Sequence, residues 1–389
     1  MSREIEQERV WAVQRFLEGE KPAAICGSLG RSRAWLYKWA KRFRPDDPAW
    51  CQAQSRQPCS NPQRTSAEVE EVVKLVRLRL YNEGLFCGAQ AIGWELDDLG
   101  VRPLPSVRTI NRMLSRHGLT HRRTGRYVPK GKPYPSLPAG FPNQTHQADF
   151  VGPCYLQGPI RFYSLNSVDV HTGRCAVEPL LAHSAQHVLD GFWAIWSRLG
   201  IPRNLQVDNE MVFYGSPTHP RGMGPLIRLC LHHNVEPWFI PPGEPWRNGV
   251  VEKFNDHYEQ KLLAKVTMTT EAELKQGSLA FEHKHNCRYR YSKLGGHTPL
   301  QALAGTGRKL RFPAKDQAPQ HPLKKPEAGR YHLVRYIRSE LQLNIFGELF
   351  PMPPDLQYEY VVATVDVKEQ ALKVFLAQQQ VAVYEYPLR

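Results

Sequence analysis

Three acidic residues stand in local settings that suit metal-assisted chemistry. Asp149 lies in the stretch THQADF, an extended segment that follows a Pro-rich run. Asp208 ends a short apolar stretch, and Glu252 follows a loop whose end is marked by three prolines and Gly249. These patterns predict two aspartates on strands and one glutamate on a helix, so that three carboxylates converge at one place.

Three convergent carboxylates would hold divalent metal ions. Cutting and rejoining a phosphodiester uses two such ions about 3.5 to 4 Å apart, which bind the attacking and the leaving oxygens. Magnesium prefers hard oxygen ligands and keeps several of its waters. We therefore predict that Asp149, Asp208 and Glu252 are both the catalytic residues and the metal ligands, with two Mg²⁺ ions per active site and Mn²⁺ as a tolerated substitute.

Other acids in the same part of the chain compete with these three. A single acid at a strand end is often only a turn residue or a cap. Asp169, Glu210 and Glu244 are such competitors, and Asp169 is the strongest because it follows the strand-like stretch LNSV. The HTG turn that comes after Asp169 favours a capping role for it.

The stretches around the three acids resemble DDE-type transposases of bacterial insertion sequences, in the retroviral-integrase-like superfamily. The resemblance is carried by HQADF, QVDNE and PPGEPWRNGVVEKFN, and it continues through Asn286, Arg288, Tyr291 and the tail GGHTPLQAL. It covers roughly residues 5–385. The resemblance implies an RNase H-like core that cleaves DNA and joins its 3'-hydroxyl ends to a target.

Two features depart from the usual pattern of this family. The second and third acids are 44 positions apart, which is longer than usual, and we assign the surplus to residues 214–225. Where relatives usually carry a Lys or Arg that touches DNA, this chain has Glu259. Lys253 or Lys261 would take over that contact, and Arg247 is a further predicted DNA contact beside the active site.

The charge of the chain favours a polyanionic partner. The sequence holds 51 Lys and Arg against 37 Asp and Glu, a formal net charge of +14. Residues 1–140 hold 24 of these basic residues and 14 of the acidic ones, so the excess is concentrated in the N-terminal part. We therefore predict double-stranded DNA as the partner, both as transposon ends and as target.

Cysteine usage and hydropathy give expectations about the compartment. The eight cysteines include no CxxC pair and no zinc-finger spacing, which favours reduced thiols in a cytosolic protein. There is no N-terminal apolar signal and no apolar run long enough for a membrane helix. We expect a cytoplasmic, nucleoid-associated bacterial protein that has no contact with a membrane.

Residues 1–44 are predicted to form a helix-turn-helix domain. An amphipathic helix over 5–17 precedes a helix that begins at Pro22, and Ser32 would cap a third helix. A third helix with a basic outer face is the arrangement that enters a major groove. The alternative is a set of helices that merely pack. The outward residues that we expect to contact DNA are Arg31, Arg33, Tyr37, Lys38 and Lys41.

A linker over 45–65 leads to a second predicted helix-turn-helix domain over 66–120. Its last helix would begin after Ser106, and the alternative is a helical bundle that only spaces the domains. The DNA contacts expected from that helix are Arg108, Asn111 and Arg112.

Residues 121–142 form a basic, Pro-rich linker. It is either an extended connector that follows the DNA phosphates or a linker surrounded by solvent. The residues of this linker that would contact DNA are Arg122, Arg123, Arg126 and Lys130.

The remaining residues are predicted to form an α/β core and a small β domain. In the core, over 143–312, strands are expected at 160–170, 175–180, 205–208 and 235–240, and helices at 184–199, 226–233 and 271–286. A linker over 313–329 precedes residues 330–389, whose alternating stretches are 331–345, 358–366 and 371–375. The fold class is thus multidomain: N-terminal all-α helix-turn-helix modules, a central α/β RNase H-like core and a C-terminal SH3-like β-barrel.

These features lead to a functional hypothesis. The protein would bind the ends of a mobile element, cleave phosphodiesters with two metal ions and join 3'-hydroxyl ends to target DNA. Two ends must be brought together, so we expect the chain to form an oligomer on DNA. The alternatives are a catalytically silent sequence-specific DNA-binding regulator and an RNase H-like nuclease without strand transfer. The sequence leaves open the end sequences, the excision route, the oligomer size and the need for a helper ATPase.

Overall fold

The computed structural model describes residues 2–53, 65–120, 133–215, 219, 221–314, 316 and 318–389. The chain divides into two compact units, Met1–Thr65 and Ser66–Arg389. The predicted DNA contacts Arg122, Arg123, Arg126 and Lys130 lie outside the described residues, as does most of the linker at 45–65. Across the described ranges, no helix is both long and apolar enough to cross a membrane.

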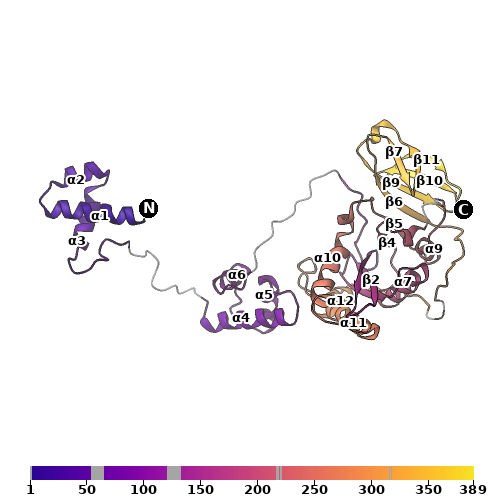
Figure 1. The fold of residues 1–389 in the computed structure, drawn as a ribbon, viewed down its shortest axis with the longest axis horizontal. Coiled ribbons are helices and arrows are strands. Elements are labelled where there is room, and N and C mark those ends of the chain that lie inside the picture. The colour runs from indigo at the N-terminus through magenta and orange to yellow at the C-terminus, as the bar shows by residue number, and fades with distance from the viewer. Residues whose placement is uncertain are drawn as a thin grey trace. The chain divides into compact units, whose positions relative to one another are not determined.

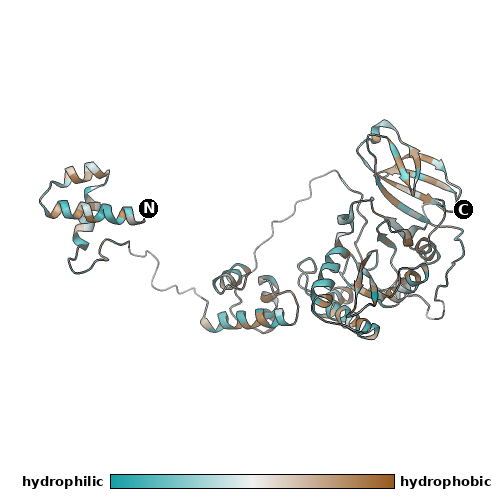
Figure 2. Ribbon diagram, viewed as in Figure 1, coloured by the Kyte–Doolittle hydropathy of each residue, from teal (hydrophilic) through white to brown (hydrophobic). Residues whose placement is uncertain are grey.

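The first unit is a three-helix domain. Its helices are α1 (Ser2–Leu17), α2 (Pro22–Leu29) and α3 (Arg33–Arg42). The Ser32 side chain accepts a hydrogen bond from the Trp35 backbone N–H, as predicted for a cap. Hydrophobic and hydrophilic residues lie on different faces of the helices (Figures 1 and 2), and the hydrophobic ones meet in a small core that includes Ile25 and Leu36.

The second unit begins with three further helices. They are α4 (Ala67–Asn82), α5 (Ala89–Asp98) and α6 (Val107–Arg116). As predicted, α6 begins after Ser106, and the Ser106 side chain caps it. Their shared core includes Val73, Ile92 and Ile110, but also Tyr289, which follows the long helix α11 (Glu271–Arg288). These three helices are therefore packed onto the core and are not a freely tethered module.

A mixed sheet of nine strands organises the rest of the unit. The strand order is β11-β10-β9-β6-β5-β4-β1-β2-β3. Strands β1, β4 and β5 run parallel, and β1, β2 and β3 form an antiparallel meander. The core strands are β1 (Thr145–Tyr155), β2 (Arg161–Asp169), β3 (Cys175–Leu180), β4 (Asn204–Val207) and β5 (Glu236–Phe239).

Helices cover both faces of this sheet. On one face Leu165 of β2 joins the large core that includes Phe192, and on the other Val168 of β2 packs with Phe254 and Phe281. The α-helices are α7 (Ala185–Leu199), α8 (Met211–Tyr214), α9 (Pro225–His232), α10 (Gly249–Tyr258), α11 (Glu271–Arg288) and α12 (Pro299–Ala304). Short 3₁₀ turns lie at Pro245–Asn248, Ser292–Leu294 and Pro354–Leu356, and a π-helical turn at Glu259–Leu263 continues α10.

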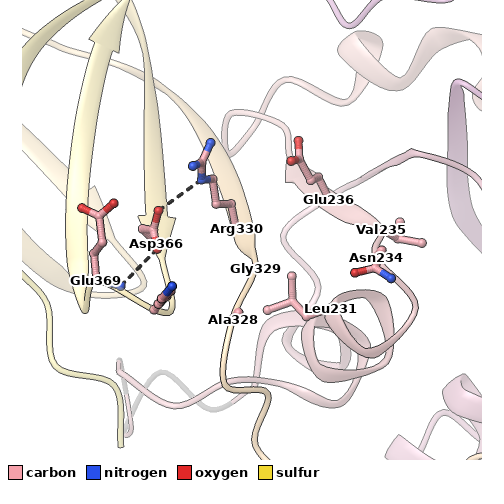
Figure 3. A pocket seen from close by; sticks show the side chains of 10 residues that line it. Leu231, Asn234, Val235, Glu236, Ala328, Gly329, Arg330, Asp366 and Glu369 are labelled. Atoms are coloured by element: carbon pink, nitrogen blue, oxygen red, sulfur yellow. Dashed lines mark hydrogen bonds and ion pairs between the residues drawn. The ribbon is translucent and has the colours of Figure 1, made fainter.

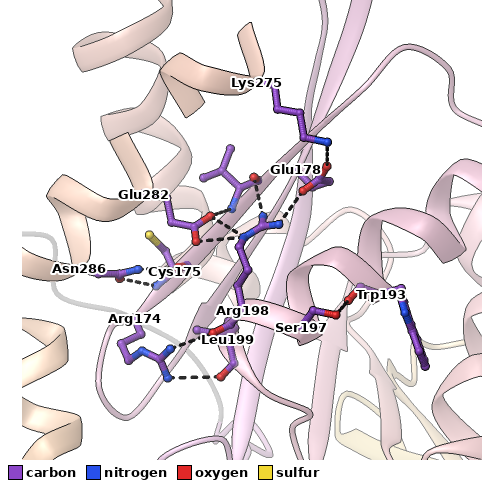
Figure 4. Close-up of polar contacts among 11 residues, drawn as sticks. Arg174, Cys175, Glu178, Trp193, Ser197, Arg198, Leu199, Lys275, Glu282 and Asn286 are labelled. Carbon is purple, nitrogen blue, oxygen red and sulfur yellow. Dashed lines mark hydrogen bonds and ion pairs between the residues drawn. The ribbon is translucent and has the colours of Figure 1, made fainter. Parts of the chain in front are cut away.

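Helix α11 covers the free edge of strand β3 (Figure 4). The Asn286 side chain accepts a hydrogen bond from Cys175 N at 2.9 Å and donates one to Cys175 O at 2.9 Å. Glu282 accepts from Val177 N, and Arg198 of α7 donates to Val177 O, each at 2.9 Å. An edge strand with unpaired N–H groups is prone to aggregate, and these side chains occupy the groups of this edge.

The C-terminal strands extend the core sheet. They are β6 (Arg330–Tyr336), β7 (Gln342–Ile345), β8 (Glu348–Pro351), β9 (Tyr360–Asp366), β10 (Ala371–Leu376) and β11 (Gln379–Glu385). A strand-rich C-terminal region is as predicted, but the stretch 331–345 contains two strands where one was expected. Within residues 318–389 the pairing closes no barrel, because β6 pairs with β5 at Trp238 and Phe239 and β11 ends the sheet.

Candidate active site

Asp149 and Asp208 lie side by side on neighbouring parallel strands. Strand β1 pairs with β4 so that Gln147 is opposite Gln206. Two residues further along each strand, the same register places Asp149 level with Asp208. Neighbouring strands are about 4.8 Å apart, and residues two apart point to the same face. Both aspartates therefore project from one edge of the sheet toward α10.

Helix α10 brings Glu252 to the same edge. The first backbone N–H groups of the helix, at Val250 and Val251, donate to Gln147 Oε1 at 2.9 and 3.2 Å. Asn248 donates to Ala148 O at 2.9 Å. The first N–H groups of a helix lack partners within the helix, and Gln147 of β1 satisfies two of them. The start of α10, with Glu252 in its first turn, is thus fixed to the strand that carries Asp149.

A chain of buried amides holds the Asp149 carboxylate. Asn255, one turn after Glu252 on α10, donates to Asp149 Oδ2 at 3.0 Å. Asn166 of β2 donates to Asn255 Oδ1 at 2.8 Å, and Ser164 donates to Asn166 Oδ1 at 2.8 Å. Each amide in this chain both donates and accepts, so the orientation of Asp149 is set from two other elements, α10 and β2.

The charges of the other two acids act on Asp149. Burial, the charge of Asp208 and the charge of Glu252 together raise the pKa of Asp149 to about 7. Burial also raises the pKa of Asp208 and of Glu252. The effect of both charges on Asp149 places Asp208 and Glu252 close to it.

Glu210 is a fourth carboxylate at this edge. Burial, then the charges of Asp208 and Asp149, raise its pKa to about 7. His183 Nε2 lies 2.8 Å from Glu210 Oε2, although the two atoms do not have hydrogen-bond geometry. Glu210 N donates to Asp208 Oδ1 at 3.1 Å. Glu210, which the sequence offered as an alternative to the three predicted acids, therefore lies beside the predicted site.

The donor chemistry of this cluster fits magnesium. All of its ionisable ligands are carboxylates, the hard oxygen donors that Mg²⁺ prefers. Crowded carboxylates without a cation are the arrangement that a bound cation would stabilise. The described ranges contain no group of three or more His, Cys, Asp or Glu side chains placed to hold a metal ion. The fit to Mg²⁺ therefore rests on the chemistry of the donors, the carboxylates of Asp149, Asp208 and Glu252.

The two remaining competitors have structural roles. Asp169 accepts hydrogen bonds from His171 N and Thr172 N, so it caps the turn as predicted. Glu244 accepts from Tyr360 of β9 at 2.8 Å and from Arg247 Nε at 2.8 Å. Arg247 is also enclosed by aromatic rings, with Tyr134 at 4.0 Å and Tyr360 at 5.0 Å. The predicted DNA contact Arg247 thus braces the loop before α10.

The predicted DNA contacts of the first unit all lie on its surface. Leu36 and Trp39 define the inward side of α3, with Leu36 fully buried. Arg31 pairs with Glu8 at 2.7 Å, which keeps its side chain near α1. The five predicted contacts, Arg31, Arg33, Tyr37, Lys38 and Lys41, are exposed.

The predicted contacts of the second unit differ in accessibility. On α6, Arg108 and Arg112 are exposed and Asn111 is half-buried. On α10, Lys253 is exposed and pairs with Asp256 at 3.0 Å. Lys261 is half-buried on the π-helical turn that follows.

Several positioning residues escaped the sequence analysis. Gln147 and Gln206 each stand two positions before an aspartate, on the same strand face. Gln147 binds the first turn of α10, and Gln206 binds the segment before it. Gln206 Nε2 donates to Arg247 O at 2.8 Å. The repeated Gln-x-Asp spacing was the available signal. Asn255 had a weaker one, its place three residues after Glu252.

A well-formed pocket lies away from the acids (Figure 3). It has a volume of about 380 Å³ and is lined by Leu231, Glu236, Arg330 and Asp366, among others. Arg330 Nε donates to Asp366 at 3.1 Å, so charges of this lining are paired with each other. Glu236 begins β5, whereas Asp208 follows the end of the parallel strand β4. The pocket is thus at the opposite edge of the sheet.

Two segments of the chain match models of known protein families. Residues 233–299 match the family model of the integrase core domain, a range that includes Glu252. Residues 6–49 match the model of a homeodomain-like domain. The chain therefore combines a segment similar to an integrase core domain with a segment similar to a homeodomain-like domain.

Solved structures with a related fold come from retroviruses. The catalytic core domain of HTLV-2 integrase, solved with magnesium, is 18% identical, with a TM-score of 0.33 over 43% of this chain and 99% of that one. The simian T-cell lymphotropic virus intasome, solved with the PP2A regulatory subunit B56 gamma, is 14% identical, with a TM-score of 0.37 over 82% and 96%. The catalytic core of BIV integrase is 18% identical, with a TM-score of 0.33 over 42% and 96%.

Proposed function

We propose that this protein is a DNA transposase that cleaves the ends of a mobile element and joins the freed 3'-hydroxyls to target DNA. The observation that carries the proposal is the grouping of Asp149, Asp208 and Glu252 at one sheet edge, where the charges of Asp208 and Glu252 raise the pKa of Asp149. An integrase core domain and a homeodomain-like domain in the same chain support DNA as the substrate.

The three acids would hold two divalent ions, with Asp149 as the shared ligand. When bound, such ions would polarise the scissile phosphate and lower the pKa of the attacking hydroxyl. Asn255 holds the plane of the Asp149 carboxylate, and the backbone of Glu210 holds that of Asp208. Gln147 binds the first turn of α10 and so fixes the position of Glu252 relative to Asp149. The protein thus presents its ligands in preset orientations, which lowers the reorganisation needed during reaction.

The homeodomain-like unit would supply sequence recognition. Its α3 presents Arg33, Tyr37, Lys38 and Lys41 on the surface, as a helix in a major groove requires. Base contacts specify a site, whereas phosphate contacts give most of the affinity. Because two element ends react together, we further propose that the chain works as an oligomer assembled on DNA.

A strand-transfer assay tests this function. The substrates are DNA from the inverted repeats that flank the gene and a plasmid target, with Mg²⁺ or Mn²⁺ as the metal. Asp208→Asn and Glu252→Gln should lower cleavage and joining about a thousandfold, corresponding to roughly 4 kcal/mol, and leave DNA binding intact. Wild-type activity in Glu252→Gln would contradict the assignment.

Glu259→Gln is the matched control. It makes the same chemical change on the turn that follows α10, at an exposed side chain, and should keep cleavage within about twofold. Tight binding by the wild type without any cleavage would favour a silent DNA-binding regulator. Cleavage without joined product would favour a nuclease.

A further inference from the structure

Two tyrosine rings from distant parts of the sequence pack against Arg247. The Arg247 guanidinium lies 4.0 Å from the ring centre of Tyr134 and 5.0 Å from that of Tyr360. The two rings also meet edge to face, with their centres 5.4 Å apart. A guanidinium is attracted to an aromatic ring because the ring face carries negative charge. We call Tyr134, Arg247 and Tyr360 the arginine cage.

Hydrogen bonds join two members of the arginine cage to Glu244. The Tyr360 hydroxyl donates to Glu244 Oε1 at 2.8 Å, and Arg247 Nε donates to Glu244 Oε2 at 2.8 Å. Arg247 Nη2 also donates to the Tyr360 hydroxyl at 3.0 Å. Tyr134 joins the cage through its ring. Removal of that ring therefore leaves these three hydrogen bonds in place and takes away only the packing.

The turn that carries Arg247 leads directly into the helix of Glu252. This 3₁₀ turn spans Pro245–Asn248, and α10 begins at the next residue. Its backbone and side chains bind the sheet, because Gln206 donates to Arg247 O at 2.8 Å and Asn248 donates to the backbone of β1 at 2.9 Å. A shift of this turn would therefore move the first turn of α10, where Glu252 lies.

Few apolar contacts of its own hold this turn in place. Pro242, Gly243 and Pro245 are exposed, and the Trp246 side chain is 60% exposed. Segments with few buried apolar contacts open locally at a low cost in free energy. The ring of Tyr134 therefore supplies packing that the neighbours of Arg247 in the sequence do not.

Tyr134 belongs to the segment that connects the α4–α6 helices to the core. Helix α6 ends at Arg116 and strand β1 begins at Thr145, so Tyr134 lies between them in the sequence. Tyr360 comes from the C-terminal strand β9. The arginine cage thus joins the connecting segment, the turn before α10 and the C-terminal strands at one point.

We propose that Tyr134 is a positioning residue of the candidate active site. By packing on Arg247 it holds the turn before α10 against local opening, and so keeps Glu252 at the sheet edge of Asp149 and Asp208. The segment that joins the α4–α6 helices to the core thereby contributes to the geometry of the site. The expected effect on cleavage rests on the proposed function, whereas the effect on the turn does not.

Amide hydrogen exchange of the full-length protein, without DNA or metal, tests the effect on the turn. Tyr134→Ala should raise the exchange rate of residues 247–251 about fivefold to thirtyfold, the effect of losing one cation–π contact. The N–H groups of Val250 and Val251 report this opening, because they donate to Gln147 Oε1 when the turn is in place.

Two variants and one strand are the controls. Tyr134→Phe keeps the ring and should exchange as the wild type does. Tyr155→Ala removes a tyrosine that is 64% exposed at the end of β1, and it should leave the turn unchanged. Exchange in β10 should be the same in all four proteins. Wild-type exchange of the turn in Tyr134→Ala would overturn the proposal, and so would an equal rise in β10, because Tyr134 would then support the fold as a whole.

Cleavage kinetics test the effect on the site. Tyr134→Ala should lower kcat about tenfold and raise the Mg²⁺ concentration needed for half-maximal rate, because Glu252 is less well placed. The KM for DNA should stay within about twofold of the wild-type value, and Tyr134→Phe should restore kcat. A raised KM with unchanged kcat would make Tyr134 a DNA contact and overturn the proposal, as would a failed rescue by phenylalanine.

The two measurements separate this inference from the proposed function. Faster exchange of the turn in Tyr134→Ala, in a protein that never cuts DNA, would support the role of Tyr134 in holding the turn and refute the transposase. A wild type that joins DNA, with Tyr134→Ala equal to it in exchange and in rate, would do the reverse.

Discussion

At the scale of single residues, Asn255 connects the candidate catalytic glutamate's helix to Asp149. It donates to Asp149 Oδ2 and accepts from Asn166, so its loss leaves one carboxylate loosely held and one buried amide without a partner. An unsatisfied buried group costs about 1 to 3 kcal/mol. We expect Asn255→Ala to reduce cleavage about tenfold to a hundredfold and to raise the Mg²⁺ concentration needed for half-maximal rate.

A magnesium titration of the cleavage rate checks this expectation. Glu259→Ala, on the turn after the same helix, is the control and should follow the wild-type curve. A merely structural role for Asn255 would lower the folded fraction and leave the magnesium dependence unchanged, and that result would contradict the positioning role.

His285 makes the stability of the core sensitive to acid. Burial lowers its pKa to about 3, and its ring contacts Gly173 O and the Tyr291 hydroxyl, each at 3.2 Å. The neutral ring is therefore part of the folded state, whereas the unfolded chain takes up a proton near pH 6.5. A histidine whose pKa is lower in the folded than in the unfolded protein destabilises the folded state as the pH falls below its pKa in the unfolded protein. Between pH 6.5 and 5 the loss is about 2 kcal/mol.

Replacing His285 tests this pH dependence. His285→Gln should be less stable than the wild type at pH 7, because its ring stacks on Tyr289. Its unfolding free energy should nevertheless fall less on going from pH 6.5 to 5. Urea unfolding at both pH values gives the two differences, and parallel losses in the two proteins would contradict the assignment.

At the scale of elements, α11 stabilises the sheet by closing its edge. Asn286 pairs with both backbone groups of Cys175, and Cys175 is almost fully buried. Asn286→Ala leaves an N–H and a C=O without partners, which should cost about 2 to 4 kcal/mol. It also exposes the edge to other strands, so aggregation should increase. Urea unfolding and light scattering measure the two effects.

The matched control for that variant is Lys275→Ala on the same helix. The Lys275 side chain is 60% exposed and lies 3.6 Å from Glu178, and an exposed ion pair contributes less than about 1 kcal/mol. Equal stability of the two variants would show that the amide does not protect the edge.

The elements that the sequence predicted well are those with local signals. Ser32 was expected to cap a helix and does so, and a helix was expected to begin after Ser106 and does so, because a cap and its helix are neighbours in the sequence. The continuation of the sheet into β6 was not predicted, because it depends on the contact of Trp238 with His332 across 94 positions. The π-helical turn at Glu259–Leu263 likewise has no local signal of its own.

In the candidate site, too, the residues with a local sequence signal were predicted and those without one were missed. Asp149, Asp208 and Glu252 were chosen from their local settings, and the structure brings them to one edge of the sheet. Gln147 and Asn255 were missed because their roles depend on which strand α10 begins against. A strand followed by an acid can be read from the sequence, whereas the partner that orients the acid depends on the tertiary fold.

At the scale of the whole molecule, the C-terminal strands complete the core. Arg335 of β6 is buried, and it donates to Asn209, the residue after Asp208, at 2.9 Å and to Ile240 O at 3.2 Å. Tyr360 of β9 donates to Glu244 in the loop before α10. The loop that follows Asp208 and the loop before α10, the helix of Glu252, are thus held by strands that lie beyond residue 329 in the sequence. Stability and site geometry depend on the same contacts.

We therefore expect residues 66–312 to be unable to fold without the strands that follow. Removing β6 leaves Trp238 and Phe239 unpaired at a sheet edge and uncovers apolar side chains that now pack with Leu333 and Val361. The fragment 66–389 keeps these contacts and loses only the first compact unit. It should be soluble and unfold in one cooperative transition, with cleavage of non-specific DNA retained and recognition of element ends weakened. Expression of both fragments, followed by thermal unfolding, tests this: a soluble 66–312 fragment with its own cooperative transition would show that the C-terminal strands are a separable domain.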